Sequence, residues 1–243
     1  MDRRRVSSLR DIGLIPGAWM GAWAWEPVTE RLRALGHPVH PVTLPGLSGE
    51  ADVSGIGLES HVEHVLSVLA ENDLRDAIVV GHSYSGVVAG SVSDRAPDRV
   101  AGTVYVDAFV PRDGKSMLDA FPAPQRDEEL RQIAENGGRW LAPDFAGATD
   151  GYGLSAEQAR WLVEQFVDHP GRTVSEPVRL MRPLAQQRTT YIECSLKDSE
   201  EVRVMRREPM STFRVLEVGH WPMAVAPDEL TTLLAEAASG HHR

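Results

Sequence analysis

Short apolar runs alternate along most of the chain with segments in which apolar residues recur every three or four positions. Continuous apolar runs favour buried strands, and the second spacing favours amphipathic helices. The predicted strands cover residues 11–15, 39–44, 78–80, 102–106, 189–194 and 213–218. The predicted helices cover residues 28–35, 61–69 and 229–238, with another between residue 84 and Pro97. This alternation predicts an α/β fold with a mostly parallel sheet that helices cover on both faces.

The pattern changes between residues 111 and 185. Prolines, glycines and short polar helices replace the strands there, and large apolar residues such as Trp140, Trp161 and Phe166 stand alone. We interpret this segment as a helical cap inserted into the core. The expected organisation is a polar leader over residues 1–10, a core made of residues 11–110 and 186–239, and the cap over residues 111–185.

The run that ends at Val80 continues as Gly81-His82-Ser83-Tyr84-Ser85-Gly86 before apolar residues resume. This pattern predicts a strand, a sharp turn and a helix, with the Ser83 hydroxyl lifted off the end of the sheet as a nucleophile. Such a turn requires small neighbours, and Gly81 fits. Ser85 stands where glycine is usual and adds a hydroxymethyl group at a close approach of helix and strand. The short pattern alone also fits an ordinary turn that contains a serine.

Composition and charge limit the possible partners. The 243 residues carry a net charge of −10, which argues against nucleic acid or an anionic membrane as a partner. Cys194 is the only cysteine, so an internal disulfide and a metal site built from cysteines are excluded. No apolar run reaches the length of about 18 residues that crosses a bilayer, and the N-terminus is a poor secretory signal. We therefore expect a cytoplasmic protein.

A serine hydroxyl needs a base within hydrogen-bond reach and a third group that orients the base. Among nine histidines, only His220 directly follows a predicted strand late in the chain, so His220 is the expected base. In a parallel sheet, chemistry collects at the carboxyl ends of the strands, where Ser83, His220 and several acids fall.

The acid has more than one candidate. Asp198 lies just beyond the strand that ends at Cys194 and keeps the chain order serine, acid, histidine, so it is the preferred acid. Asp107, at the end of the strand over residues 102–106, is the main alternative. Glu200 and Glu201 are less favoured alternatives.

Attack on a carbonyl also requires donors for the oxyanion that develops. The backbone N–H of Tyr84, directly after the nucleophile, is one expected donor. The loop after the first strand is expected to supply the second. Ala18 is the choice within that loop, because Pro16 has no N–H and Gly17 lets the backbone come close.

With these residues in place, the chain resembles the α/β-hydrolase superfamily, and within it the small branch of plant methylesterases and hydroxynitrile lyases that includes bacterial esterases. The resemblance covers nearly the whole chain. It is carried by residues 14–23, 36–37, 44–46, 81–84, 107–111 and 219–220. The resemblance implies Ser83 and His220 in the triad, the acid at Asp198, oxyanion donors at Ala18 and Tyr84, and a cap over the pocket.

Two departures separate the chain from the hydroxynitrile lyases of this branch. The lyases carry a lysine just after the catalytic histidine and a threonine in the first loop, where this chain has Trp221 and Gly17. The chain thus lacks the groups that handle cyanide in the lyases, and the lyase activity is disfavoured.

The expected function is hydrolysis of a small apolar or aromatic carboxylic ester or lactone through a Ser-His-Asp triad and an acyl-enzyme, without cofactor or metal. Trp19, Phe109, Trp221 and Met223 flank the expected catalytic loops and are predicted to line the substrate pocket. One alternative is a biosynthetic acyltransferase or cyclase that uses the same triad, and another is a ligand-binding protein on this fold. The expected partner is a small molecule, and a homodimer is left open.

Overall fold

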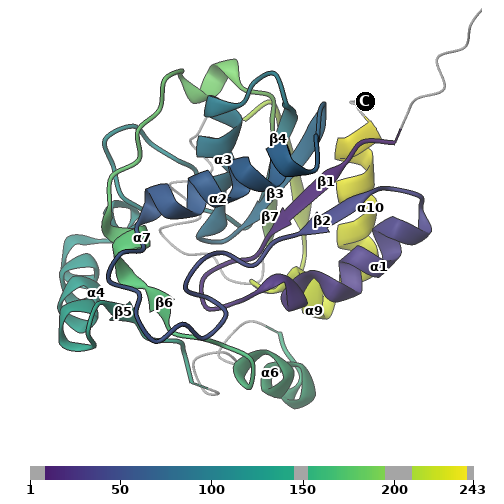
Figure 1. The fold of residues 1–243 in the computed structure, drawn as a ribbon. Helices are drawn as coiled ribbons and strands as arrows, with labels where there is room; N and C mark the ends of the chain where they lie inside the picture. Colours follow the sequence, from purple (N-terminus) through teal and green to yellow (C-terminus); the bar gives the residue numbers. More distant parts are fainter. Residues whose placement is uncertain (1–8, 145–152, 195–209, 240–243) are drawn as a thin grey trace, which may run out of the picture.

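The computed structural model describes residues 9–144, 153–194 and 210–239. Within these residues, six strands form one sheet in the order β2-β1-β3-β4-β7-β8, and every neighbouring pair is parallel (Figure 1). The strands are β1 Ile12–Ile15, β2 Val39–Pro41, β3 Ala77–His82, β4 Val100–Val106, β7 Thr189–Cys194 and β8 Thr212–Leu216. The predicted parallel sheet is confirmed.

Burial explains the strand sequences. Every residue of β3 is buried, because helices cover both faces of the middle of the sheet. β8 lies at one edge, where Phe213 and Val215 are exposed and alternate with partly buried residues. β2 ends at Pro41 and β8 ends at Leu216, earlier than predicted. After Leu216 the chain turns, with the Val218 N–H donating to the Leu216 carbonyl.

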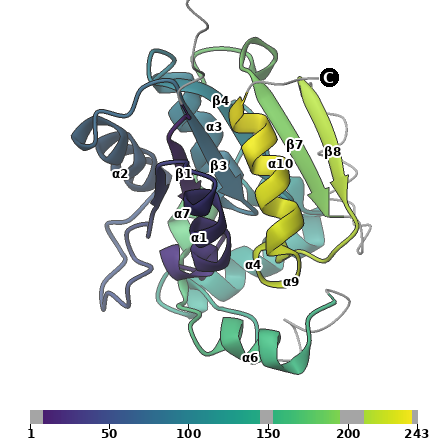
Figure 2. The ribbon, with the colours of Figure 1, turned by 90° about the vertical axis from the view of Figure 1, so that its right-hand side faces the viewer.

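Helices lie on both faces of this sheet. Helices α1 Glu26–Ala34 and α10 Pro227–Ser239 cover one face, and α2 Leu58–Glu71 and α3 Ser85–Arg95 cover the other (Figures 1 and 2). Each face encloses its own cluster of buried side chains, with Leu32 and Leu234 in one and Val65 and Val88 in the other. The strands therefore lie between two apolar layers that hold their carboxyl ends in place.

In the predicted cap segment, the described residues 111–144 and 153–185 contribute no strand to the main sheet. Its elements are η2 Leu118–Ala120, α4 Ala123–Glu135, β5 Arg139–Trp140, α6 Ala156–Val163, β6 His169–Pro170 and α7 Gly171–Ser175, and η3 Leu184–Gln186 follows. Figures 1 and 2 show α4 and α6 beyond the carboxyl ends of the strands. β5 and β6 pair in a small antiparallel sheet. The sequence analysis did not predict this sheet, because a strand of two residues is too short to show a pattern of apolar positions. The exact borders of leader, core and cap stay a prediction.

A buried carboxylate ties α3 to the end of the predicted cap segment. Asp94 is fully buried and accepts hydrogen bonds from the backbone N–H groups of Met181 at 2.6 Å and Arg182 at 3.1 Å. The Arg182 guanidinium adds a bond to the same carboxylate at 3.3 Å. Because every buried polar group needs partners, this cluster fixes where the chain leaves the cap segment.

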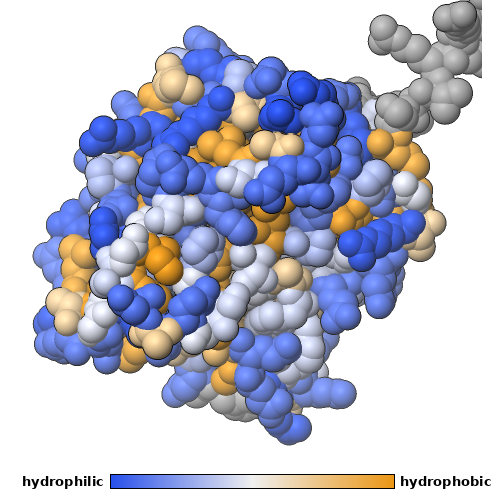
Figure 3. Space-filling view, viewed as in Figure 1, coloured by the Kyte–Doolittle hydropathy of each residue, from blue (hydrophilic) through white to orange (hydrophobic). Residues whose placement is uncertain are grey.

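On the face seen in Figure 3, hydrophilic residues cover most of the surface and hydrophobic residues form scattered groups. Exposed large apolar side chains such as Leu35, Leu130 and Met181 belong to different elements. Among the described residues, no helix combines the length and the apolar character that a membrane span requires.

Candidate active site

Ser83 lies at the sharp turn between β3 and α3. Its φ of 51° is in the left-handed region, which non-glycine residues rarely adopt. A Cβ on Gly81 would lie 2.7 Å from the Ser85 carbonyl carbon, so the turn tolerates only glycine there. The local sequence therefore forms the predicted strand, turn and helix, with Ser83 at the carboxyl end of β3.

The Ser85 side chain faces the loop after β1. The side chain is fully buried, and its hydroxyl donates a hydrogen bond to the Pro16 carbonyl in that loop. The closest approach falls one residue later, where a Cβ on Gly86 would lie 2.7 Å from the Ala108 Cβ. Ser85 thus joins α3 to the first loop, and Gly86 is the position that needs a missing side chain.

Ser83, His220 and Asp107 form one chain of hydrogen bonds. The Ser83 Oγ lies 3.0 Å from His220 Nε2, and His220 Nδ1 lies 2.6 Å from Asp107 Oδ2. The second oxygen, Asp107 Oδ1, accepts the Cys194 backbone N–H at 3.2 Å. A proton on Nδ1 satisfies the carboxylate and leaves Nε2 unprotonated toward Ser83, which is the tautomer that a general base requires.

Four consecutive strands of the sheet, in the order β3-β4-β7-β8, bring these groups together. Ser83 follows β3, Asp107 follows β4, and His220 lies on the loop after β8, while β7 supplies the N–H that orients the carboxylate. The Asp107 side chain is 8% exposed and the His220 side chain 23% exposed, so the imidazole is open enough for a substrate to reach.

The preferred acid of the sequence analysis, Asp198, lies outside the described residues, as do Glu200 and Glu201. Asp107, the alternative, is the carboxylate that contacts His220. Both aspartates satisfy the order serine, acid, histidine, so chain order does not separate them. The separation depends on side-chain direction, and the φ of 44° at Asp107 turns its carboxylate toward the imidazole.

The loop after β1 lies directly against the nucleophile. A Cβ on Gly17 would lie 3.0 Å from the Ser83 Cβ and 2.7 Å from His82 Nδ1, so only glycine allows this approach. Ala18, the next residue, is buried, and Tyr84 is the N-cap residue of α3. Gly17, the residue before Ala18, therefore lies against Ser83, and Tyr84 directly follows Ser83 in the chain. The oxyanion role of Ala18 and Tyr84 stays a prediction.

His82 supports the loop that carries His220, a contact that sequence reasoning missed. Its Nε2–H donates to the His220 carbonyl at 2.6 Å, and its buried Nδ1 has no hydrogen-bond partner among the residues that the structure describes. Burial, with His220 nearby, lowers the pKa of His82 well below 6.5. The imidazole is therefore neutral and acts as a fixed donor to the backbone of the base.

A second pair of buried histidines lies on the other side of the first loop. Burial lowers the pKa of His61 from 6.5 to about 4, and nearby His64 lowers it further while the Pro45 carbonyl opposes the shift. Burial also lowers the pKa of His169 well below 6.5, with His61 adding to the effect. Nothing in the spacing of these residues signals that they meet, because they come from α2 and the cap segment.

These neutral histidines make stability depend on pH. The unfolded chain takes up protons on His61, His82 and His169 below pH 6.5, whereas the folded chain does not. We expect the free energy of unfolding to fall as the pH falls from 6.5 toward 4, by up to about 1.4 kcal/mol per pH unit for each histidine. Urea denaturation at a series of pH values measures this slope.

A His61→Gln variant is the matched control, since it keeps a polar side chain but removes one titrating group. Its slope is expected to be smaller than that of the wild type. Carboxylates with lowered pKa act in the same direction only in more acidic solution, below 3.8 in the case of Asp119. A stability that stays flat between about pH 7 and pH 5 contradicts the prediction.

Aromatic rings form a connected series beside His220. Trp19 lies 4.4 Å from Trp140 and 6.3 Å from Phe166 between ring centroids, and Phe166 lies 6.4 Å from Trp221. Trp221 in turn lies 5.4 Å from the His220 ring. Trp19 and Trp221, two of the predicted pocket residues, thus belong to an aromatic wall that joins the cap segment to the catalytic loops.

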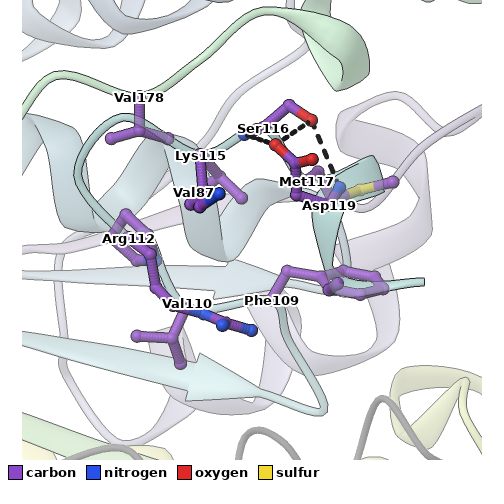
Figure 4. A pocket seen from close by; sticks show the side chains of 11 residues that line it. Val87, Phe109, Val110, Arg112, Lys115, Ser116, Met117, Asp119 and Val178 are labelled. Carbon is purple, nitrogen blue, oxygen red and sulfur yellow. Dashed lines mark hydrogen bonds between the residues drawn. The ribbon is translucent and has the colours of Figure 1, made fainter. Parts of the chain in front are cut away.

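Met223 and Phe109 are the other two predicted pocket residues, and their place in the substrate pocket stays a prediction. Met223 is fully buried in the core cluster of α1 and α10. Phe109 lines a pocket beside α3, together with Val87, Met117 and Val178 (Figure 4). Its backbone N–H donates to the Ser83 carbonyl at 3.0 Å, so this pocket shares a wall with the nucleophile turn.

Polar residues rim the same pocket. Figure 4 shows Ser116 bonded to Asp119 across from the Phe109 ring, with distances of 2.8 Å from the Ser116 N–H and 3.0 Å from its hydroxyl. Lys115 and Arg112 also line it. Among the described residues, no group of three or more histidine, cysteine or carboxylate side chains could hold a metal ion.

Comparison with known proteins places this geometry in a family. A carbendazim hydrolyzing esterase of Nocardioides is 40% identical over 111 residues, which are 45% of this chain and 46% of that protein, so the match spans about half the relative. Methylesterase 3 of Arabidopsis thaliana is 23% identical over 93% of this chain and 95% of its own length.

Among solved structures, an extracellular alpha/beta-hydrolase from a Paenibacillus species is 25% identical and superimposes with a TM-score of 0.84, over 94% of this chain and 98% of that one. It is described as sharing structural and functional homology with tobacco salicylic acid binding protein 2. The alpha/beta hydrolase family model matches residues 14–233, nearly the whole chain. The predicted resemblance is confirmed, and the chain belongs to the alpha/beta hydrolase family.

Proposed function

We propose that this protein is a serine esterase that hydrolyses a small carboxylic ester or lactone with an apolar or aromatic part, through the triad of Ser83, His220 and Asp107. The observation that carries this proposal is the continuous hydrogen-bonded chain from Ser83 Oγ through His220 to Asp107. Ordinary structural histidines do not link a strained serine to a carboxylate in this way.

In the first half-reaction, Ser83 Oγ forms a bond to the ester carbonyl carbon while its proton moves to His220 Nε2. The N–H groups of Ala18 and Tyr84 stabilise the oxyanion, and Asp107 stabilises the imidazolium. The C–O bond to the alcohol then breaks, and the alkoxide takes the proton from Nε2. In the second half-reaction, water attacks the acyl-enzyme, gives its proton to Nε2, and the collapse returns that proton to Ser83.

The aromatic wall supports the substrate class. The ring of Trp221 lies next to His220, and the rings of Phe166 and Trp19 continue the series from it. Aromatic surfaces favour flat apolar groups in offset or edge contacts. The similar proteins are called a carbendazim hydrolyzing esterase and a methylesterase, which is consistent with small esters as substrates.

The alternative of a transferase or cyclase differs only in the group that accepts the acyl chain, because the acyl-enzyme is shared. A ligand-binding role is less supported, since Ser83, His220 and Asp107 are in hydrogen-bond contact. The cytoplasmic location stays a prediction of the sequence analysis, which left a homodimer open.

The test is intact-mass measurement after exposure to a fluorophosphonate probe, with Ser83→Ala as the matched control. We expect one adduct on the wild type and none on the variant, because only an activated serine reacts. A panel of methyl and aryl esters and lactones then follows in water enriched in ¹⁸O. Hydrolysis places one ¹⁸O in the released acid, whereas transfer to an added alcohol does not. An unlabelled wild type that also leaves every ester intact contradicts the proposal.

A further inference from the structure

Trp19, directly after the proposed oxyanion donor Ala18, is held by the small sheet of the cap segment. Its backbone N–H donates to His169 Nδ1 at 3.4 Å, and its carbonyl accepts the Val167 N–H at 2.9 Å. Its indole Nε1–H donates to the Trp140 carbonyl at 3.1 Å. Both backbone groups of Trp19, its N–H and its carbonyl, are therefore hydrogen-bonded to the cap segment.

The protonation of His169 follows from its other partner. The Thr173 hydroxyl donates its proton to the Pro170 carbonyl at 2.7 Å, so at His169 Nε2, 2.8 Å away, it serves as an acceptor. His169 Nε2 must then carry the proton, and Nδ1 presents a lone pair to the Trp19 N–H. His169 is fully buried, which keeps the ring neutral and this tautomer in place.

The backbone at Trp19 needs such support. Its φ of 66° lies in the left-handed region, where a bulky side chain is a rare outlier. A peptide in this region relaxes when its hydrogen bonds are removed. Gly17, two residues before Trp19, lies against Ser83. Relaxation at Trp19 therefore moves the first loop and, with it, the Ala18 N–H that the proposed function assigns to the oxyanion.

His169 also touches the second proposed donor residue. Its ring meets the Tyr84 ring at 4.6 Å between centroids in an edge contact, and Tyr84 donates its hydroxyl proton to His61 Nδ1 at 2.9 Å. That direction is set by His61 Nε2–H, which donates to the Pro45 carbonyl at 2.8 Å. One imidazole from the cap segment thus contacts both Trp19, the residue after the proposed donor Ala18, and Tyr84, the second proposed donor.

We propose that His169 is a positioning residue for the oxyanion hole, acting through the Trp19 N–H and the Tyr84 ring. The inference rests on the proposed function, because it assigns the geometry of the same reaction. It means that the cap segment, besides covering the substrate, sets the backbone that stabilises the transition state.

Three variants at this position separate the proposal from a general loss of structure. His169→Asn places an amide oxygen near the position of Nδ1 and can accept the Trp19 N–H. His169→Gln places its amide nearer the position of Nε2, and His169→Ala removes both contacts. His40→Asn is the matched control, since His40 is a partly buried histidine on β2 whose partner is Asp11. Active sites are counted by fluorophosphonate titration, and kcat and KM are measured per active site.

We expect His169→Ala and His169→Gln to lose about 10- to 100-fold in kcat with KM changed less than about threefold, because oxyanion donors act in the transition state. His169→Asn is expected to recover most of the rate, and His40→Asn to match the wild type. The Ki of a trifluoromethyl ketone, whose adduct carries the oxyanion, should rise in proportion to the loss of kcat/KM. Long-range ¹H–¹⁵N correlation should show the Nε2–H form of His169 between about pH 5 and pH 8.

If the wild type is active and His169→Ala has the same kcat, this inference is overturned and the proposed function stays intact. Loss of kcat that asparagine does not restore, or that leaves the inhibitor unaffected, also overturns it. A wild type that is neither labelled nor active on esters overturns the proposed function and this inference together.

Discussion

Replacing Ser83 with alanine is expected to lower kcat on the best ester substrate by about 10⁶-fold, and His220→Ala to lower it by a similar factor. The nucleophile and its base act as a unit, since Ser83 Oγ and His220 Nε2 share one hydrogen bond of 3.0 Å. Without the imidazole the serine stays protonated, and without the serine the imidazole has no group to activate. The double variant should therefore lose no more than either single variant.

Steady-state kinetics of the wild type, both single variants and the double variant measure this non-additivity. The control is the urea concentration at the midpoint of unfolding of each variant. This midpoint should stay near that of the wild type, because the Ser83 side chain is small and the His220 side chain is partly exposed. Additive losses in the double variant mean that the two residues act in separate steps, contrary to the triad.

Asp107→Asn is expected to lower kcat by about 10⁴-fold at neutral pH with little change in stability. The Cys194 N–H holds Oδ1, so the asparagine keeps its carbonyl oxygen there and turns its NH₂ group toward His220 Nδ1. Nδ1 must then accept a hydrogen bond, which places the imidazole proton on Nε2, facing Ser83. A base that already carries a proton at Nε2 cannot take another from the serine.

Asp198→Asn is the matched control, because it makes the same chemical change at the acid that the sequence analysis preferred. We expect its kcat to stay within about threefold of the wild type. A large loss in Asp198→Asn beside an active Asp107→Asn assigns the acid to Asp198 instead. Because Nε2 accepts a proton from Ser83 in acylation and from water in deacylation, the tautomer argument predicts that both half-reactions are slower, and single-turnover measurements with an activated ester test each of them.

Backbone strain gathers at the site of this reaction. Trp19, Ser83 and Asp107 all have positive φ, and each follows the carboxyl end of a strand of the main sheet. Such conformations persist only where surrounding contacts determine them. The contacts are the Ser85 hydroxyl on Pro16, the Cys194 N–H on Asp107, and the cap sheet on Trp19.

The sequence by itself determined the elements of the fold and the nucleophile turn. Strands in the middle of the sheet are continuous apolar runs because both of their faces are buried, so β3, β4 and β7 could be predicted from the sequence. The small residues around Ser83 carry the turn geometry locally. His220 was also readable, because a loop directly after a late strand is a local feature.

Only the tertiary structure decided which carboxylate meets His220 and which histidines support the loops. Two aspartates follow neighbouring strands, and local sequence does not encode which of their side chains points at the imidazole. His61, Tyr84 and His169 come from α2, the nucleophile turn and a two-residue strand, and their hydrogen bonds span up to 150 residues between Trp19 and His169. Such contacts depend on packing of distant segments, for which periodicity and motif spacing carry no signal.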